Sequence, residues 1–165
     1  MEKIELVGAM PEDFEDYFAI KDTDSDVFWI GFEGRPNRDK LYACFMERTA
    51  DRDFGNPGDK RIYMIRADGR NVGMIQFTLS EEGLEFGIGV MEREQGKGYG
   101  SAGMKLAVKE AVRYSDRCFA HIRDDNFASQ HALMSAGLER TDEAEIKMFP
   151  QSGPVMYRLY ILREN

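Results

Sequence analysis

Residues 84–123 carry a strand, a glycine-rich turn, a helix and a second strand in close succession. The segment GLEFGIGVM alternates large apolar residues with Glu85 and glycines, as a strand does, and REQGKGYG follows it directly. The stretch YGSAGMKLAVKEAVRYS then repeats basic residues every four positions opposite an apolar side, and RCFAHIR has the pattern of a short strand. A strand joined through a helix to another strand predicts a right-handed crossover between two parallel strands.

The segments before this unit predict further strands and helices. Residues 3–7 have the pattern of a first strand, and Pro11 with its acidic neighbours predicts a short helix that ends near Lys21. Residues 22–36 are polar and rich in turn-forming residues, and we expect an ordered loop there, with its aromatic residues either lining a site or capping the core. A second helix is predicted over residues 38–50.

Antiparallel strands are predicted on both sides of the crossover unit. Alternation around Asp68 and Gly69 is typical of a hairpin, and the strand from residue 84 extends it to a three-stranded meander. Two closing strands are expected over residues 138–148 and 154–163. The predicted fold class is therefore α/β (α+β), with a mixed, mostly antiparallel sheet of about seven strands, one parallel pair and helices on both faces, in a single domain spanning residues 1–165.

Composition limits the partners. The 165 residues carry a formal net charge of -8 with a pI near 4.9, which argues against nucleic acid as a partner and favours a cationic amine. Cys44 and Cys118 stand apart without metal-ligand spacing, so we expect two reduced thiols and no metal. The first residues lack a signal-peptide pattern and no stretch reaches the ~20 apolar residues of a membrane span, so a cytoplasmic protein without a membrane partner is predicted.

The glycine-rich turn predicts an anion site. It leads into the N-terminus of a helix, where unpaired backbone N–H groups and the positive end of the helix dipole meet. Glycine at positions 96, 98 and 100 lets a phosphate approach these N–H groups and tolerates unusual backbone dihedrals. The spacing fits neither the Walker loop nor the dinucleotide-binding fingerprint.

Two motifs give the chain a resemblance to a known family. Gln95, Gly98 and Gly100 match the pattern Q/R-x-x-G-x-G/A that follows a strand in the GNAT superfamily of N-acetyltransferases. The later segment NFASQHALMSAGL is similar to the second motif of that superfamily, especially in its ribosomal-protein-acetylating and N-terminal-acetylating branches, although Leu138 stands where phenylalanine is usual.

The resemblance implies acetyl-CoA as co-substrate and direct transfer of its acetyl group to a primary amine in a ternary complex. Arg93 or Lys97 is expected near the phosphates. The implied cofactor-binding residues are Val90, Met91, Gln95, Gly96, Lys97, Gly98, Tyr99, Gly100, Ser101, Asn126 and Ser129.

The reaction needs a base, because a lysine-like amine with a pKa near 10.4 is less than about 0.1% neutral at pH 7. His121 and His131 are the residues with an ordinary pKa in the useful range. His121 occupies the position of a glutamate base in the ribosomal-protein-acetylating branch and is the first choice; the alternative is a structural histidine bonded to a backbone group. His131 is expected to be a packing or surface residue. Glu85, on the neighbouring parallel strand, is predicted to orient His121, to act as base through water, to bind a cationic acceptor, or to be an exposed carboxylate.

Two further roles are assigned from the resemblance. A backbone N–H near Val90 or Met91 is expected to hold the oxyanion. Many relatives place a tyrosine after the second motif to protonate the leaving thiolate, and Met134 stands there in this chain. Tyr157, Tyr160 or Ser135 are substitutes, although a thiol leaves readily without an acid.

Alternatives to an enzyme remain open at this point. One is a non-catalytic module that binds or senses acyl-CoA, and another is a regulator that binds nucleotide phosphates. The expected acceptor is a small-molecule or peptide amine, such as a peptide N-terminus, polyamine, aminoglycoside or amino sugar. The expected oligomeric state is a monomer or a homodimer.

Overall fold

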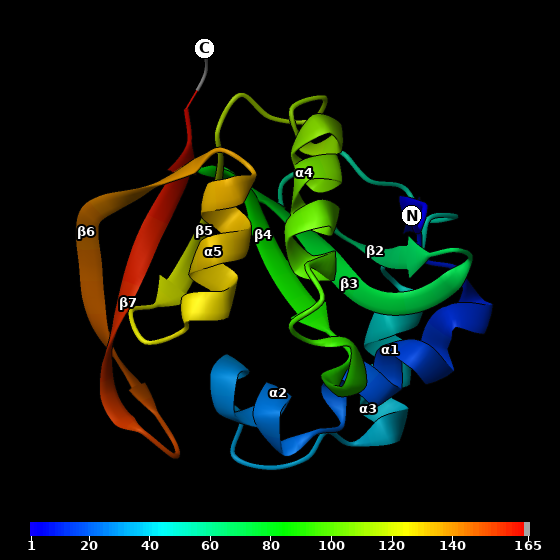
Figure 1. Cartoon of the computed structure of the whole chain (residues 1–165), viewed down its shortest axis with the longest axis horizontal. Helices are drawn as coiled ribbons and strands as arrows, with labels where there is room; N and C mark the ends of the chain where they lie inside the picture. Colours follow the sequence, from blue (N-terminus) through cyan, green and yellow to red (C-terminus); the bar gives the residue numbers. More distant parts are fainter. Residues whose placement is uncertain (164–165) are drawn as a thin grey trace.

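The computed structural model describes residues 1–163 and contains one seven-stranded sheet (Figure 1). The strands are β1 (Ile4–Gly8), β2 (Lys60–Ala67), β3 (Arg70–Ser80), β4 (Gly83–Val90), β5 (Cys118–Arg123), β6 (Leu138–Phe149) and β7 (Gly153–Leu162). Their order across the sheet is β1-β2-β3-β4-β5-β7-β6. The predicted mixed sheet with helices is confirmed, and the two last residues of the predicted domain lie outside the described residues.

Within residues 1–163, β4 and β5 form the one parallel pair, as predicted. They pair at only two positions, Leu84 with Cys118 and Glu85 with Phe119. Beyond Glu85 the strands diverge, so that the sheet opens between their carboxyl ends (Figure 1). This opening is where a ligand can enter the sheet.

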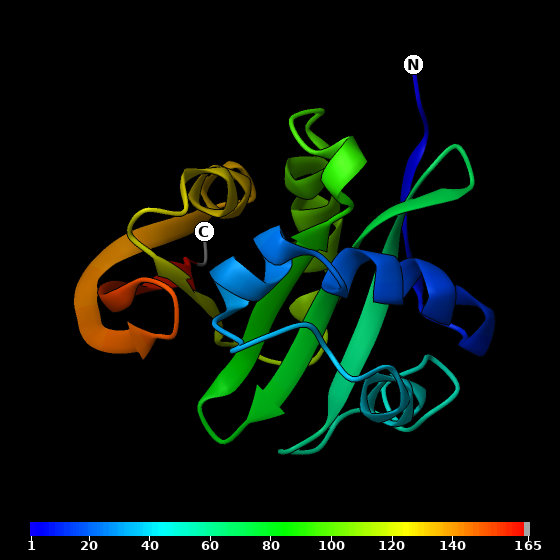
Figure 2. The ribbon, with the colours of Figure 1, turned by 90° about the horizontal axis from the view of Figure 1, so that it is seen from below.

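Helices cover both faces of the sheet (Figure 2). The helices are α1 (Phe14–Lys21), α2 (Asp24–Ile30), α3 (Arg38–Met46), α4 (Tyr99–Ala111) and α5 (Phe127–Ser135), with short 3-10 turns at Pro11–Asp13 and Glu92–Glu94. The helices α4 and α5 lie on one face, and α1 and α3 lie on the other. Gly103 lets α4 approach the sheet closely, because a Cβ at this position would meet the Ile65 side chain at 2.5 Å.

The hydrophobic core is divided by the sheet into two clusters. The larger one lies under α4 and α5 and includes Ile65, Phe77 and Met104. The smaller one lies under α1 and α3 and includes Phe14 and Phe45. The side chains of both clusters are almost fully buried, so the two sets of helices are fixed against a common sheet.

One prediction was wrong, because the expected loop over residues 22–36 contains α2. The Thr23 side chain caps this helix by accepting a hydrogen bond of 3.0 Å from the Asp26 N–H. The helix ends at Ile30, and the capping residue Gly31 that follows has a φ of 92°. The helix α3 also ends at Met46, before the predicted end at residue 50.

Candidate active site

A cavity of about 710 Å³ lies between the diverging ends of β4 and β5. The N-termini of α4 and α5 form one side of it, and α2, β6 and β7 form the other. A volume of this size suits a ligand as large as a cofactor. Of the expected site residues, those that line the cavity are Glu85, Val90, Gln95, Gly96, Gly98, Tyr99, Gly100, Ser101, His121, Asn126 and Ser129.

The glycine-rich turn presents free backbone donors to this cavity. The first backbone hydrogen bond of α4 runs from the Ala102 N–H to the Gly98 carbonyl at 3.1 Å. The N–H groups of residues 96–101 donate to no protein atom within residues 1–163. Gly96 and Gly98 have φ values of 80° and 85°, which favour glycine. Gly100 differs from them, because it lies inside the helix and its missing Cβ allows close packing on Ile88.

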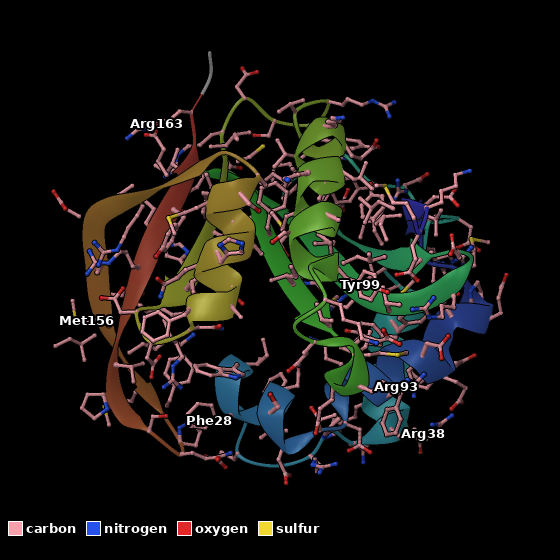
Figure 3. The ribbon with its side chains drawn as sticks, viewed as in Figure 1. Phe28, Arg38, Arg93, Tyr99, Met156 and Arg163 are labelled. Carbon is pink, nitrogen blue, oxygen red and sulfur yellow. The ribbon has the colours of Figure 1, made fainter. Side chains whose placement is uncertain are left out.

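Both cations expected near the phosphates, Lys97 and Arg93, lie outside the cavity wall. Lys97 is held by the Glu94 carboxylate at 3.1 Å, and Arg70 approaches the same carboxylate at 3.5 Å. The hydrogen bond from Lys97 holds the pKa of Glu94 below its ordinary value. Arg93 is exposed and does not line the cavity (Figure 3). The anion site therefore consists mainly of backbone N–H groups.

A second helix N-terminus faces the same cavity. Asn126 caps α5, since its side-chain oxygen accepts a hydrogen bond of 3.2 Å from the Ser129 N–H. Both residues line the cavity, so the positive ends of two helix dipoles point toward it. This arrangement favours a ligand with several negative charges.

The two expected oxyanion donors, the N–H groups of Val90 and Met91, differ in whether they are already hydrogen-bonded. The Met91 N–H donates to the Val72 carbonyl at 2.9 Å, and the Met91 side chain is buried, so this residue offers no free donor. Hydrogen bonds in an antiparallel pair alternate in direction, so the Val90 N–H points away from β3 and toward the opening. The Gln95 side chain donates to the Val90 carbonyl at 3.3 Å and supports this segment.

His121 and Glu85 meet across the opening. The Nδ1 atom of His121 lies 2.8 Å from Oε2 of Glu85. The hydrogen bond to Glu85 raises the pKa of His121 above its ordinary value, and the more distant carboxylates of Glu145 and Glu143 act in the same direction. The imidazole stacks on the Tyr157 ring with centroids 5.5 Å apart and planes at 12°, which fixes its orientation.

Of the three expected substitutes for the missing tyrosine, only Tyr157 lines the cavity. Tyr157 lines the cavity, and burial raises its pKa to about 12. Tyr160 is fully buried, and the Ser135 hydroxyl donates to the Ala132 carbonyl at 2.9 Å; neither residue lines the cavity. Met134 is 49% exposed and also lies outside the cavity wall.

Several cavity residues were not assigned from the sequence. Asp26, Trp29 and Ile30 come from α2, whose helical form was not predicted, and Lys147 comes from β6. His131 is exposed, as expected, but it also lines the cavity. The signal that could have found α2 was Thr23 followed three residues later by Asp26, with Gly31 as the stop.

No helix within residues 1–163 is long and apolar enough to cross a membrane. No group of three His, Cys, Asp or Glu side chains gathers there as ligands of a metal ion would.

The cavity combines diverging parallel strands with the free N–H groups of a glycine turn, which suits an anionic ligand. The imidazole–carboxylate pair of His121 and Glu85 lines the same cavity. The chain belongs to the acetyltransferase (GNAT) domain family, whose model matches residues 3–139. It is therefore an acetyl-CoA-dependent N-acetyltransferase. A comparison with curated protein sequences gave no match.

Solved structures share the fold at low sequence identity. A spermidine N-acetyltransferase from Vibrio cholerae, in complex with CoA and spermine, has a TM-score of 0.77 and 14% identity, with 96% of this chain and 95% of that chain covered. A putative phosphinothricin N-acetyltransferase has a TM-score of 0.77 and 18% identity over 98% and 100% of the two chains. An aminoglycoside acetyltransferase in complex with coenzyme A has a TM-score of 0.71 and 15% identity over 95% and 94%.

Proposed function

We propose that acetyl-CoA binds with its diphosphate on the backbone N–H groups of residues 96–101 and its pantetheine arm in the opening between β4 and β5. The free donors, the positive φ of Gly96 and Gly98 and the second helix N-terminus at Asn126 support this placement. Tyr99 anchors the start of α4 through its hydroxyl, which bonds to Glu2 and Arg70 (Figure 3). We assign Lys97 a supporting role, because Glu94 already holds it.

His121 is the proposed base. When the Glu85 carboxylate accepts a hydrogen bond from Nδ1, the Nε2 atom of the neutral ring is left as the proton acceptor. The amine loses a proton to Nε2 as its nitrogen attacks the thioester carbonyl, and the Val90 N–H is the donor proposed for the oxyanion. The carbon–sulfur bond then breaks and CoA leaves as a thiolate. Tyr157 keeps its proton because its pKa is near 12, so its hydroxyl can donate a hydrogen bond to the thiolate.

We infer that the acceptor is a cationic amine, and first of all a small molecule with more than one ammonium group. Three carboxylates act on His121, namely Glu85 at 2.8 Å and Glu143 and Glu145 at longer range. Lys147 is the opposing charge on this side of the cavity. The chain as a whole carries a charge of -8, and structural relatives were crystallised with spermine or with kanamycin. A cation is drawn toward such a surface.

The finer branch indicated by the second motif stays a prediction. A protein or peptide N-terminus, as in the ribosomal-protein-acetylating and N-terminal-acetylating branches, is the second acceptor class to be tested. The cytoplasmic location, the single-domain organisation and the monomeric or homodimeric state also stay predictions.

An acceptor screen tests the proposal. The wild type is incubated with acetyl-CoA and spermidine, kanamycin, glucosamine, phosphinothricin and a peptide with a free N-terminus, and released thiol and acetylated product are measured together. We expect a multiply charged amine to give the highest rate, with one thiol released per acetyl group transferred. CoA binding without any acetylated product would instead support the acyl-CoA-sensing alternative, and stabilisation by ATP but not by CoA would support the nucleotide-binding one.

A further inference from the structure

Arg123, at the end of β5, carries a charge almost completely removed from water. Its side chain is 2% exposed, and it is among the largest fully buried side chains of the described residues. A buried guanidinium is costly unless each of its faces and edges has a partner. The partners of Arg123 come from three separate segments around the cavity.

The edge of the guanidinium is bound by polar groups. Asp125 accepts two hydrogen bonds, from Nε at 2.9 Å and from Nη2 at 2.8 Å. Ser152, in the turn between β6 and β7, accepts a third at 3.0 Å, and the Phe28 carbonyl on α2 lies 3.5 Å from Nη1. Arg123 therefore joins the β5–α5 loop, the β6–β7 hairpin and α2.

The faces of the guanidinium are covered by aromatic rings from two of these segments. Its central carbon lies 4.6 Å from the ring centre of Phe28, 5.1 Å from that of Trp29 and 4.5 Å from that of Phe149. Phe28 and Trp29 belong to α2, whereas Phe149 ends β6. Figure 3 shows Phe28 on α2 beside the tip of the β6–β7 hairpin.

The same ring of Trp29 also forms part of the cavity wall. The helix α2 has only seven residues, and a helix this short needs tertiary contacts to persist. On the other side of the cavity, β7 supplies Tyr157, which stacks on His121. The position of Trp29 relative to His121 thus depends on the contacts between α2 and the β6–β7 hairpin, which Arg123 makes.

We propose that Arg123 is a positioning residue for the acceptor amine. It acts indirectly, because it holds α2 and its Trp29 ring at a fixed distance from the β6–β7 hairpin. This inference rests on the proposed function in taking His121 as the base, and it takes the acceptor to enter between α2 and His121, which both line the cavity. The proposed CoA site lies at the glycine turn and at Asn126, and Asp125, which Arg123 binds, directly precedes Asn126. A lysine at position 123 keeps a positive charge for Asp125 but loses the planar group that the three rings cover, so R123K is the variant in which the acceptor KM and the Kd for CoA are compared.

The chain offers a matched control for this residue. Arg158 on β7 also makes two hydrogen bonds to an aspartate of the β5–α5 loop, from Nε and Nη2 to Asp124, both at 2.8 Å. Its side chain is 13% exposed, and it lies outside the cavity wall. Replacing Arg158 breaks a comparable ion pair without touching Trp29.

The first arm of the test uses the intrinsic fluorescence of Trp29, the one tryptophan of the sequence. Acrylamide quenching is compared among wild type, R123Q, R123K and R158Q. We expect the quenching constant to rise by about twofold in R123Q, because a mobile indole is more accessible, and to rise less in R123K. R158Q should match the wild type. Equal quenching in R123Q and wild type would overturn the proposal.

The second arm compares steady-state kinetics with CoA binding. With spermidine, or with the best amine of the screen, the acceptor KM should rise by about tenfold in R123K while the Kd for CoA changes less than about twofold. An equal rise of the acceptor KM in R158K would show general destabilisation and overturn the proposal. If no amine is acetylated, the proposed function fails. The quenching comparison still decides whether Arg123 fixes the position of Trp29 in the cavity wall.

Discussion

The imidazole of His121 lies 2.8 Å from the carboxylate of Glu85, next to the last residue pair that joins β4 and β5. The two side chains are therefore held by backbone pairing on one side and face the cavity on the other. Through this contact a side chain of β4 orients the imidazole of β5. It also makes the protonation of His121 sensitive to Glu85.

The first prediction concerns stability as a function of pH. The folded-state pKa of His121 is raised above its ordinary value, mainly by the hydrogen bond to Glu85. The stabilisation from the protonated pair is fully present below the unfolded pKa of about 6.5 and is lost as pH rises through the raised folded pKa. We expect Glu85→Gln to lower Tm more at pH ~6 than at pH ~9. The effect should be modest, because both side chains are partly exposed.

The same substitution in a His121→Gln background is the control. There the Tm difference caused by Glu85→Gln should no longer depend on pH over this range. A pH-dependent difference that persists without His121 would assign the effect to another group.

The second prediction concerns the glycine turn. Gly98→Ala places a Cβ at a φ of 85°, which costs roughly 1–2 kcal/mol of stability. In the proposed complex the added methyl group also lies at the turn that holds the diphosphate. We expect the Kd for CoA, measured by isothermal titration, to rise by at least about tenfold.

Gly69→Ala is the matched variant, since Gly69 has a φ of 83° in the β2–β3 hairpin. At both glycines a Cβ would meet no other atom within 4 Å. Both variants should lose similar stability, and only Gly98→Ala should lose CoA affinity. Unchanged affinity in Gly98→Ala would place the diphosphate elsewhere.

The third prediction concerns the cap of α5. Asn126→Ala removes the acceptor for the Ser129 N–H and should cost about 1 kcal/mol in denaturant unfolding. It should also weaken CoA binding by about threefold or more, because the N-terminus of α5 faces the cavity in which we propose that CoA binds. Asn37→Ala removes an equivalent cap from α3, away from the cavity, and should reduce stability alone. Equal effects of the two variants on CoA affinity would refute a cofactor role for Asn126.

Most of the sheet was predictable, because strand alternation and turn residues are local signals. Alternation identified the strands that carry Glu85 and His121, and the strand–helix–strand order predicted that these strands are parallel neighbours. The structure has this pairing and brings the two side chains together, which was one of the alternatives for Glu85. The glycine turn was equally readable, since a positive φ at Gly96 and Gly98 leaves few residue choices.

The side of the cavity formed by α2, β6 and β7 was not predictable. The helix α2 is short, and its helix signals were weaker than the loop pattern of the polar residues around it. Asp26 and Trp29 were therefore assigned to a loop. The stacking of Tyr157 on His121 and the enclosure of Arg123 depend on how the β6–β7 hairpin meets β5 and α2. Such contacts join residues far apart in the chain, and no local pattern encodes them.

The most direct test of the catalytic account is the pH dependence of kcat/KM for the best acceptor in wild type, Glu85→Gln and His121→Gln. We expect a rising limb in the wild type with an apparent pKa above the ordinary histidine value, and a shift of this limb to lower pH in Glu85→Gln. His121→Gln should lose the limb and at least about 100-fold in rate while it still binds CoA. A His121→Gln enzyme with the rate and pH profile of the wild type would contradict the account.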